Sequence, residues 1–113
     1  MNIERGDILL VEFDPTRGSE IKKTRPAVVV TNNIANQFSP VIVVVPLTSQ
    51  KLDKIRAFEV LLTKATGLTK NSKAVIAQLR TVDRSRLQKK IGSLSAADMK
   101  SIDNSLKLHL DLE

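Results

Sequence analysis

The sequence predicts an α+β protein that is mainly β: a small curled antiparallel sheet or SH3-like barrel with a C-terminal helix and short helical turns. Two observations predict this fold. Five short apolar runs lie at the spacing typical of small antiparallel barrels. The clearest helical periodicity begins only at Ser95, near the end of the chain. Because 113 residues give room for one modest core, we expect a single domain spanning residues 1–113.

The strands are expected at residues 7–13, 27–31, 41–45, 58–62 and 73–79, with one helical turn at 34–38. Pro26 is tolerable as the first residue of the second strand, and the third strand is expected to end near Pro46. The valine runs of these two strands do not alternate with polar residues, which predicts burial of the sheet on both faces. We expect the C-terminal helix to cover one face and a second copy of the chain to cover the other.

The C-terminal helix has a clear start signal. Ser95 is the expected N-cap, Asp98 occupies the third helical position, and Leu94 can pack against Met99 across the cap. The apolar face of this helix is predicted to consist of Met99, Ile102, Leu106 and Leu110.

Composition limits the function. The net charge of +6 favours an anionic partner such as nucleic acid, anionic lipid or an acidic protein tail. With three phenylalanines as the only aromatic residues, a base-stacking RNA platform is a poor interpretation. The absence of cysteine excludes disulfides and thiolate metal sites. No apolar run reaches the roughly 20 residues of a membrane helix, so we expect a soluble, cytoplasmic protein without membrane contact.

The loop of residues 14–26 is the most informative segment. It separates the first two predicted strands, and Pro15 and Gly18 supply its turn formers. A structural loop does not need four cations, which here are Arg17, Lys22, Lys23 and Arg25. A cationic loop on a rigid sheet is a common way to grip a polyanion.

Three further motifs each have a structural and a functional interpretation. Arg25 before Pro26 is either a surface arginine or a guanidinium fixed at a strand end, where it can clamp a phosphate. Thr48 and Ser49 either cap a turn or bind an anion. After the last predicted strand, Gln78 can read a base edge and Arg80 can hold a phosphate. For Asp83 and Arg86, three residues apart, we favour a structural pair.

The side-chain inventory restricts the possible chemistry. A single histidine excludes a two-imidazole acid–base scheme, and no spacing indicates a metal site, so we expect neither metal nor cofactor. RNA cleavage remains possible with the 2′-hydroxyl as the nucleophile. Glu20 is the only nearby carboxylate that can act as a base.

Three blocks of the chain, in order, resemble the MazF/PemK family of toxin endoribonucleases. The first is Arg-Gly-Asp at residues 5–7, followed by Asp-Pro-Thr-Arg-Gly-Ser-Glu at 14–20 and Arg25-Pro26. The second is Leu-Thr-Ser at residues 47–49. The third is Gln-Leu-Arg-Thr-Val-Asp-Arg-Ser-Arg-Leu at residues 78–87. The resemblance covers almost the whole chain and implies the PemK/CcdB-like toxin fold.

The resemblance also implies roles. Arg25 takes the place of the family's catalytic arginine, and Thr48 that of the threonine that pairs with it at the scissile phosphate. The implied activity is sequence-specific, metal-independent cleavage of single-stranded messenger RNA, leaving 2′,3′-cyclic phosphate and 5′-hydroxyl ends. The implied partners are RNA, a cognate acidic antitoxin and a second copy in a homodimer. The residues expected to bind RNA are Arg17, Ser19, Lys22, Lys23, Asn32, Ser49, Gln78 and Arg80.

One departure and two alternatives stand beside this interpretation. Residues 21–24 read Ile-Lys-Lys-Thr where many relatives carry Gln and Gly, which predicts a stiffer, more basic loop. A non-catalytic RNA-binding barrel would need only the basic loops. A gyrase-inhibiting toxin of the same fold would depend on a C-terminal tryptophan, and the chain has none.

Overall fold

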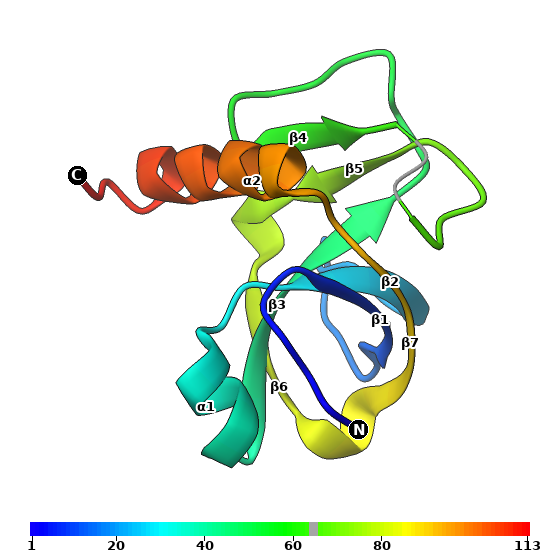
Figure 1. Ribbon diagram of the computed structural model, residues 1–113. Helices are drawn as coiled ribbons and strands as arrows, with labels where there is room; N and C mark the ends of the chain where they lie inside the picture. The colour runs from blue at the N-terminus through cyan, green and yellow to red at the C-terminus, as the bar shows by residue number, and fades with distance from the viewer. Residues whose placement is uncertain (64–65) are drawn as a thin grey trace.

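The computed structural model describes residues 1–63 and 66–113, in which a strongly curled antiparallel sheet is flanked by two α-helices (Figure 1). Two single-turn 3₁₀ helices, η1 and η2, interrupt the second half of the chain. The elements are β1 (Asp7–Glu12), β2 (Thr24–Val29), α1 (Asn33–Phe38), β3 (Val41–Thr48), β4 (Glu59–Leu62), β5 (Ser72–Val75), η1 (Ile76–Gln78), β6 (Arg80–Asp83), η2 (Arg84–Arg86), β7 (Leu87–Ser93) and α2 (Ala96–His109). None of the helices in these residues is long and apolar enough to cross a bilayer.

The sheet is organised around β3, its longest strand. The strand order is β4-β5-β3-β2-β1-β7, and β6 pairs with β3 beside this path. Residues 41–44 of β3 pair with β6, whereas residues 47–48 pair with β5. In the described part of the chain the sheet therefore curls without closing into a hydrogen-bonded barrel, as the curled-sheet alternative predicted.

Both faces of the central strands are buried, as predicted from the valine runs. In β2, Ala27 and Val29 belong to one hydrophobic core, while Val28 points into a second core on the opposite face. Ile102 of α2 seals the second core, and Val82 of β6 contributes to the first. The chain thus supplies both covers itself. The expectation that a second copy is needed as a cover was wrong, and the homodimer remains a prediction on other grounds.

Several predicted strand boundaries were wrong. β3 continues through Pro46 to Thr48, because Pro46 falls in the two-residue interval between pairing with β6 and pairing with β5. The strand predicted at 73–79 ends at Val75, where η1 turns the chain. β6 and β7 were missed because most of their side chains are partly or fully exposed. Tertiary pairing with β3 and β1 decides their conformation.

Helix α2 begins as predicted. The Ser95 hydroxyl accepts a hydrogen bond from the Asp98 N–H at 3.1 Å, a cap of the kind that stabilises a helix by about 1 kcal/mol. Ile102 is buried, with Met99 and Leu106 packed around it. Leu110 was predicted on this face but is 46% exposed, because the helix ends one residue earlier, at His109.

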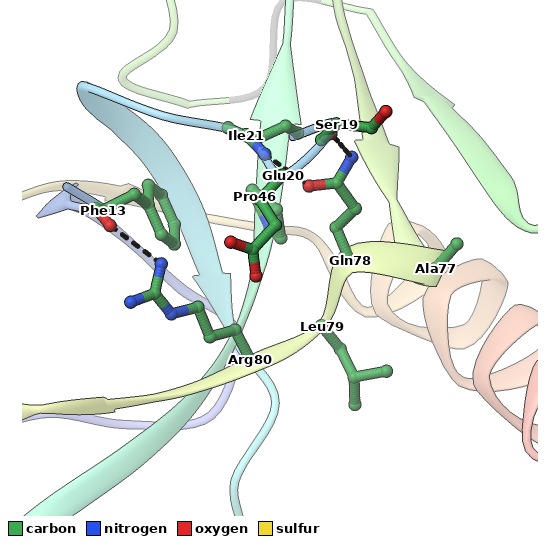
Figure 2. Close-up of a pocket in the computed structure, with 9 residues that line it drawn as sticks. All are labelled: Phe13, Ser19, Glu20, Ile21, Pro46, Ala77, Gln78, Leu79 and Arg80. Atoms are coloured by element: carbon green, nitrogen blue, oxygen red, sulfur yellow. Dashed lines mark hydrogen bonds between the residues drawn. The ribbon is translucent and has the colours of Figure 1, made fainter. Parts of the chain in front are cut away.

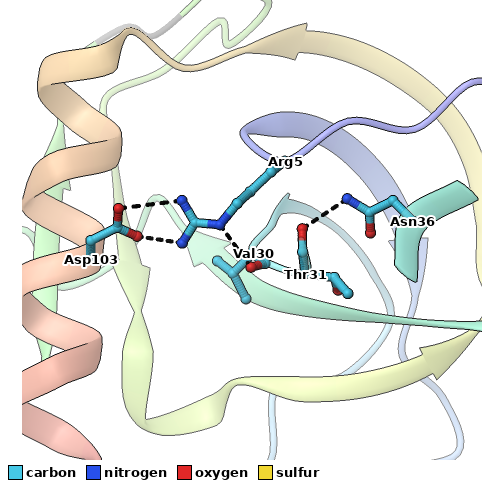
Figure 3. Close-up of polar contacts among 5 residues, drawn as sticks. All are labelled: Arg5, Val30, Thr31, Asn36 and Asp103. Atoms are coloured by element: carbon cyan, nitrogen blue, oxygen red, sulfur yellow. Dashed lines mark hydrogen bonds and ion pairs between the residues drawn. The ribbon is translucent and has the colours of Figure 1, made fainter. Parts of the chain in front are cut away.

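Arg5 ties three elements together at the entry to β1 (Figure 3). Its guanidinium forms a two-pronged ion pair with Asp103 of α2, and its Nε donates to the Val30 carbonyl at 2.9 Å. Beside it, the Asn36 amide donates to the Thr31 carbonyl at 2.8 Å and so holds α1 against the end of β2. The Arg-Gly-Asp step therefore has a structural role, as expected of a strand entry.

Candidate functional site

Arg25 and Thr48 lie side by side across two paired strands. β2 and β3 pair antiparallel, with Ala27 opposite Pro46. Continuing this register by two residues in each strand places Arg25 opposite Thr48, where β2 begins and β3 ends. Two cavities share both residues in their linings, which agrees with this placement. The sequence alone could not bring these two together, because 22 residues separate them along the chain.

The larger cavity is an open groove of about 880 Å³. Six cationic and three acidic side chains take part in its lining, so its surface favours an anion. Predicted site residues in the lining are Ser19, Glu20, Lys22, Arg25, Thr48 and Gln78. Three more cations come from residues 49–58, the segment between β3 and β4 that we call the basic loop: they are Lys51, Lys54 and Arg56.

The polar atoms of Arg25 and Thr48 are arranged to receive an anion. Arg25 is partly buried, and its Nε donates to the Lys22 carbonyl at 3.4 Å, which leaves the other guanidinium N–H groups for a ligand. Thr48 Oγ1 accepts a hydrogen bond from the Gln50 N–H at 3.2 Å. Because the oxygen is the acceptor in that bond, the Thr48 hydroxyl proton can be donated to a ligand.

The segment between β1 and β2, residues 13–23, forms a flap over one end of the groove. Gln78 holds it: its Oε1 accepts from the Ile21 N–H at 2.5 Å, and its Nε2 donates to the Ser19 carbonyl at 3.1 Å (Figure 2). Gln78 ends η1, not a strand as predicted, and in this structure its amide binds the flap. Under the flap lies a pocket of about 390 Å³ that includes Glu20 and Arg80.

Arg80 and Arg86 anchor the base of the flap. Arg80 donates to the Phe13 carbonyl at 2.8 Å, and its guanidinium lies 5.7 Å from the centre of the Phe13 ring. Arg86 donates to the carbonyls of Glu12 and Asp14. Arg80 was predicted to hold a phosphate, and here it lines the pocket under the flap instead of the groove.

Asp83 and Arg86 have structural roles, but the expectation that they pair with each other was wrong. The ion pairs of the described residues do not include them, and each binds backbone groups instead. Asp83 accepts from the Ser85 N–H at 2.8 Å and so caps η2. Hydrogen bonds from Ser85, with the charge of Arg86 adding a smaller contribution, lower the pKa of the Asp83 carboxyl.

The basic loop is held from below by a buried ion pair that sequence analysis missed. Lys73 of β5 and Glu59 of β4 lie 3.0 Å apart (Nζ to Oε2), with side chains 7% and 8% exposed. The Lys73 ammonium also donates to the carbonyls of Lys51 and Lys54 at 2.9 and 3.3 Å. The available signal was a lone charge in each of two short apolar strands, since lysine is rarely buried without a partner.

A smaller cavity of about 110 Å³ lies on the other side of Arg25 and Thr48. Ser49 lines it, together with Thr69 and Lys70 from the segment before β5. That segment packs closely on β7: a Cβ at Gly67, whose φ is +89°, would lie 1.7 Å from the Ile91 carbonyl oxygen. A glycine is therefore required where this wall of the cavity meets the sheet.

Three residues predicted to bind RNA are not among the described lining residues of these cavities. Arg17 and Lys23 are exposed on the flap. Asn32 caps α1 by accepting the Ala35 N–H at 2.9 Å, and it follows the end of β2 that is remote from Arg25. The cap explains Asn32 without RNA. Among the described residues, no three His, Asp or Glu side chains gather in a metal-binding cluster.

Together, the fold and the groove define a class of protein: a small curled-sheet domain in which an arginine and a threonine line a cationic groove. Comparison with known proteins then identifies the family. Residues 4–110 match the family model described as PemK-like, MazF-like toxin of type II toxin-antitoxin system. The chain belongs to this family.

Individual relatives agree with this assignment. The chain is 46% identical to "Endoribonuclease MazF9" of Mycobacterium tuberculosis, over 97% of this chain and 98% of the relative. Among solved structures it resembles MazF from Deinococcus radiodurans, with a TM-score of 0.85, 24% identity and 99% of both chains covered. It also resembles a mycobacterial endoribonuclease in complex with its cognate antitoxin, with a TM-score of 0.81, 21% identity, and 98% and 97% of the two chains covered.

Proposed function

We propose that this toxin is a sequence-specific endoribonuclease that cleaves single-stranded messenger RNA. The observation that carries the proposal is the placement of Arg25 opposite Thr48 in the lining of a cationic groove. The name of the mycobacterial relative, "Endoribonuclease MazF9", supports the same activity at 46% identity. A single strand of RNA fits such an open groove better than a duplex, because its phosphates can follow the basic lining.

The proposed reaction is a metal-independent transesterification. The 2′-oxygen of RNA forms a bond to the adjacent phosphorus, and the bond from phosphorus to the 5′-oxygen breaks. The 2′-hydroxyl proton passes to the Glu20 carboxylate, and the leaving 5′-oxygen takes up a proton from water. The products are a 2′,3′-cyclic phosphate and a 5′-hydroxyl.

Arg25 and Thr48 stabilise the charge that builds up on the phosphoryl oxygens in this step. A guanidinium carries N–H donors and no acceptor, so Arg25 acts as a donor. The Thr48 hydroxyl supplies a second donor aimed by its bond to Gln50. Glu20 lines the same groove from the flap, and the Arg17 N–H donates to one of its carboxylate oxygens at 2.6 Å.

The flap, the basic loop and the small cavity divide the proposed RNA contacts. Lys22 and Ser19 of the flap, with Lys51 and Lys54 of the basic loop, contact phosphates along the groove. Ser49 contacts the nucleotide on the other side of the scissile phosphate. Arg17, Lys23, Gln78 and Arg80 reach RNA only when the flap moves. We further propose that Asn32 contacts RNA only when the bound RNA extends beyond the groove.

The proposed partners follow from the toxin family and from the charge. A cognate antitoxin with an acidic segment can lie in the cationic groove and exclude RNA. A solved mycobacterial neighbour is described as a complex with its cognate antitoxin, which supports this partner. We further propose that the toxin acts as a homodimer in the cytoplasm, where messenger RNA is available.

One experiment tests the activity. Purified protein is incubated with a long RNA in EDTA, and cleavage is compared with that by Arg25→Ala. Removal of a donor of this kind typically costs on the order of 10²–10³ in rate, so the variant is expected to be nearly inactive. Lys100→Ala, on the exposed side of α2, is the charge-matched control and is expected to cut normally.

The ends of the cleaved RNA and the possible negative results of this experiment each distinguish between the alternatives. New ends are expected to accept a 5′ label without phosphatase treatment, because they carry a 5′-hydroxyl. Undiminished cleavage by Arg25→Ala would contradict the proposed site. Binding without cutting by the unmodified protein would indicate a non-catalytic RNA-binding barrel, and gyrase inhibition without any effect on RNA would indicate the other toxin class.

A further inference from the structure

We propose that the buried pair Lys73–Glu59, which we call the clamp, fixes the basic loop in the conformation that binds RNA. The inference rests on the proposed function, because it takes RNA to be the ligand of the groove. It concerns two buried side chains at the edge of the groove, which the family blocks in the sequence do not include.

The Lys73 ammonium is fully used inside the protein. Its three N–H groups have three partners: Glu59 Oε2 at 3.0 Å, the Lys51 carbonyl at 2.9 Å and the Lys54 carbonyl at 3.3 Å. The side chain is 7% exposed. Lys73 therefore has no donor left for a phosphate and is a positioning residue, whatever binds above it.

Glu59 completes the attachment from the neighbouring strand. Its Oε1 accepts the Arg56 N–H at 3.0 Å, while its own N–H donates to the Arg56 carbonyl at 2.9 Å. Burial alone would raise the pKa of the Glu59 carboxyl. The hydrogen bonds from Arg56 and Lys73, with the charges of both side chains, outweigh burial and lower it. The carboxylate is thus ionised at neutral pH, as the clamp requires.

The two side chains hold the basic loop at three points of its backbone. The same three residues, Lys51, Lys54 and Arg56, line the groove that also contains Arg25 and Thr48. Long cationic side chains lose conformational entropy when they bind, and a fixed backbone lowers that cost. The clamp therefore converts three flexible charges into a preorganised surface for phosphates.

Stability alone is a weak explanation for such a pair. Replacing a buried ion pair by apolar residues of similar volume is often neutral or stabilising. The fold would therefore tolerate an apolar pair between β4 and β5. An apolar pair could not, however, bind the carbonyls of Lys51 and Lys54 or the N–H of Arg56. What the charges of Lys73 and Glu59 provide, and an apolar pair would not, is therefore a fixed backbone conformation of the basic loop.

The test is the double variant Lys73→Met/Glu59→Leu, which removes both charges and leaves no unpaired ion. Lys100→Met is the control for the loss of an exposed lysine. We expect the melting temperature to stay within a few degrees of the unmodified protein. The KM for a fixed RNA substrate should rise about tenfold while kcat changes by less than about twofold, because Arg25 and Thr48 lie on the strands.

Trypsin provides a readout that does not need RNA. It cuts after lysine and arginine, so release of the loop should accelerate cleavage at residues 51, 54 and 56 about tenfold while other sites keep their rates. An unchanged KM together with unchanged loop cleavage would overturn the proposal. So would a loss confined to kcat. If the double variant does not fold, Glu59→Gln is subjected to the same two measurements.

These measurements distinguish a failure of the clamp from a failure of the proposed RNA cleavage. If the unmodified protein does not cut RNA, the proposed function fails, whereas trypsin cleavage and RNA affinity still test the clamp. If RNA is cut and the double variant binds and cuts it like the unmodified protein, the clamp is refuted and the enzyme stands.

Discussion

The flap and the basic loop border the same groove, but the protein holds them in different ways. Gln78, a neutral side chain that is partly exposed, binds the flap through the Ile21 N–H and the Ser19 carbonyl. The basic loop is bound by Lys73 and Glu59, two buried ions. Neutral hydrogen bonds open to solvent contribute about 1 kcal/mol each, whereas charge-assisted bonds are roughly twice as strong.

A groove bordered by one weakly held and one firmly held loop can adapt to a chain and still place its charges accurately. The flap, with weaker attachments, can open to admit a chain and then close over it. The basic loop, with its backbone fixed at three points, keeps its cations in place throughout. Arg25 and Thr48 lie between the two loops on rigid strands, as a reaction centre requires.

The largest effect is expected at Thr48, the last residue of β3, directly before the basic loop. Thr48→Val keeps the shape but loses both the donor to the phosphate and the acceptor for Gln50. We expect kcat to fall on the order of 10²–10³ in an RNA cleavage assay. Thr48→Ser keeps the hydroxyl and should recover most of the rate. Equal activities of the two variants would show that the Thr48 hydroxyl takes no part in the reaction.

An intermediate effect is expected when the flap is released. Gln78→Ala removes both hydrogen bonds, and we expect kcat/KM to fall about 30-fold, as for the loss of two neutral bonds of about 1 kcal/mol each. Trypsin should cut the flap faster while the basic loop keeps its rate. Gln78→Glu retains the acceptor for the Ile21 N–H and should lose less. A basic loop that loosens along with the flap would show that the two are not held independently.

The smallest effect is expected from acid. Because the folded-state pKa of Glu59 lies below its ordinary value of 4.5, its stabilising contribution is present above that pH and is lost as the pH falls through the lowered value. Hydrogen exchange, corrected for intrinsic rates, should therefore rise in residues 50–56 below about pH 4.5. Exchange of the Ile21 N–H, which is bound by the neutral Gln78 amide, should not rise in this pH range. Glu59→Gln should abolish the difference.

The sequence alone was sufficient for several features of this protein. Residues that set local conformation or a chemical type were interpretable: Ser95 as a cap, the valine runs as strands buried on both faces, and the family blocks around Arg25 and Thr48. These signals are local, because capping, alternation and turn formation depend on a few neighbouring residues.

Only the tertiary structure decided the rest. β6 and β7 are strands because β3 and β1 offer them backbone partners, not because of their own side chains. The meeting of Arg25 with Thr48 depends on the register of β2 and β3. The role of Lys73 depends on a carboxylate 14 residues earlier and on two carbonyls of a loop. The energy of each of these contacts depends on which distant groups the fold brings within hydrogen-bond distance, and no local pattern encodes that.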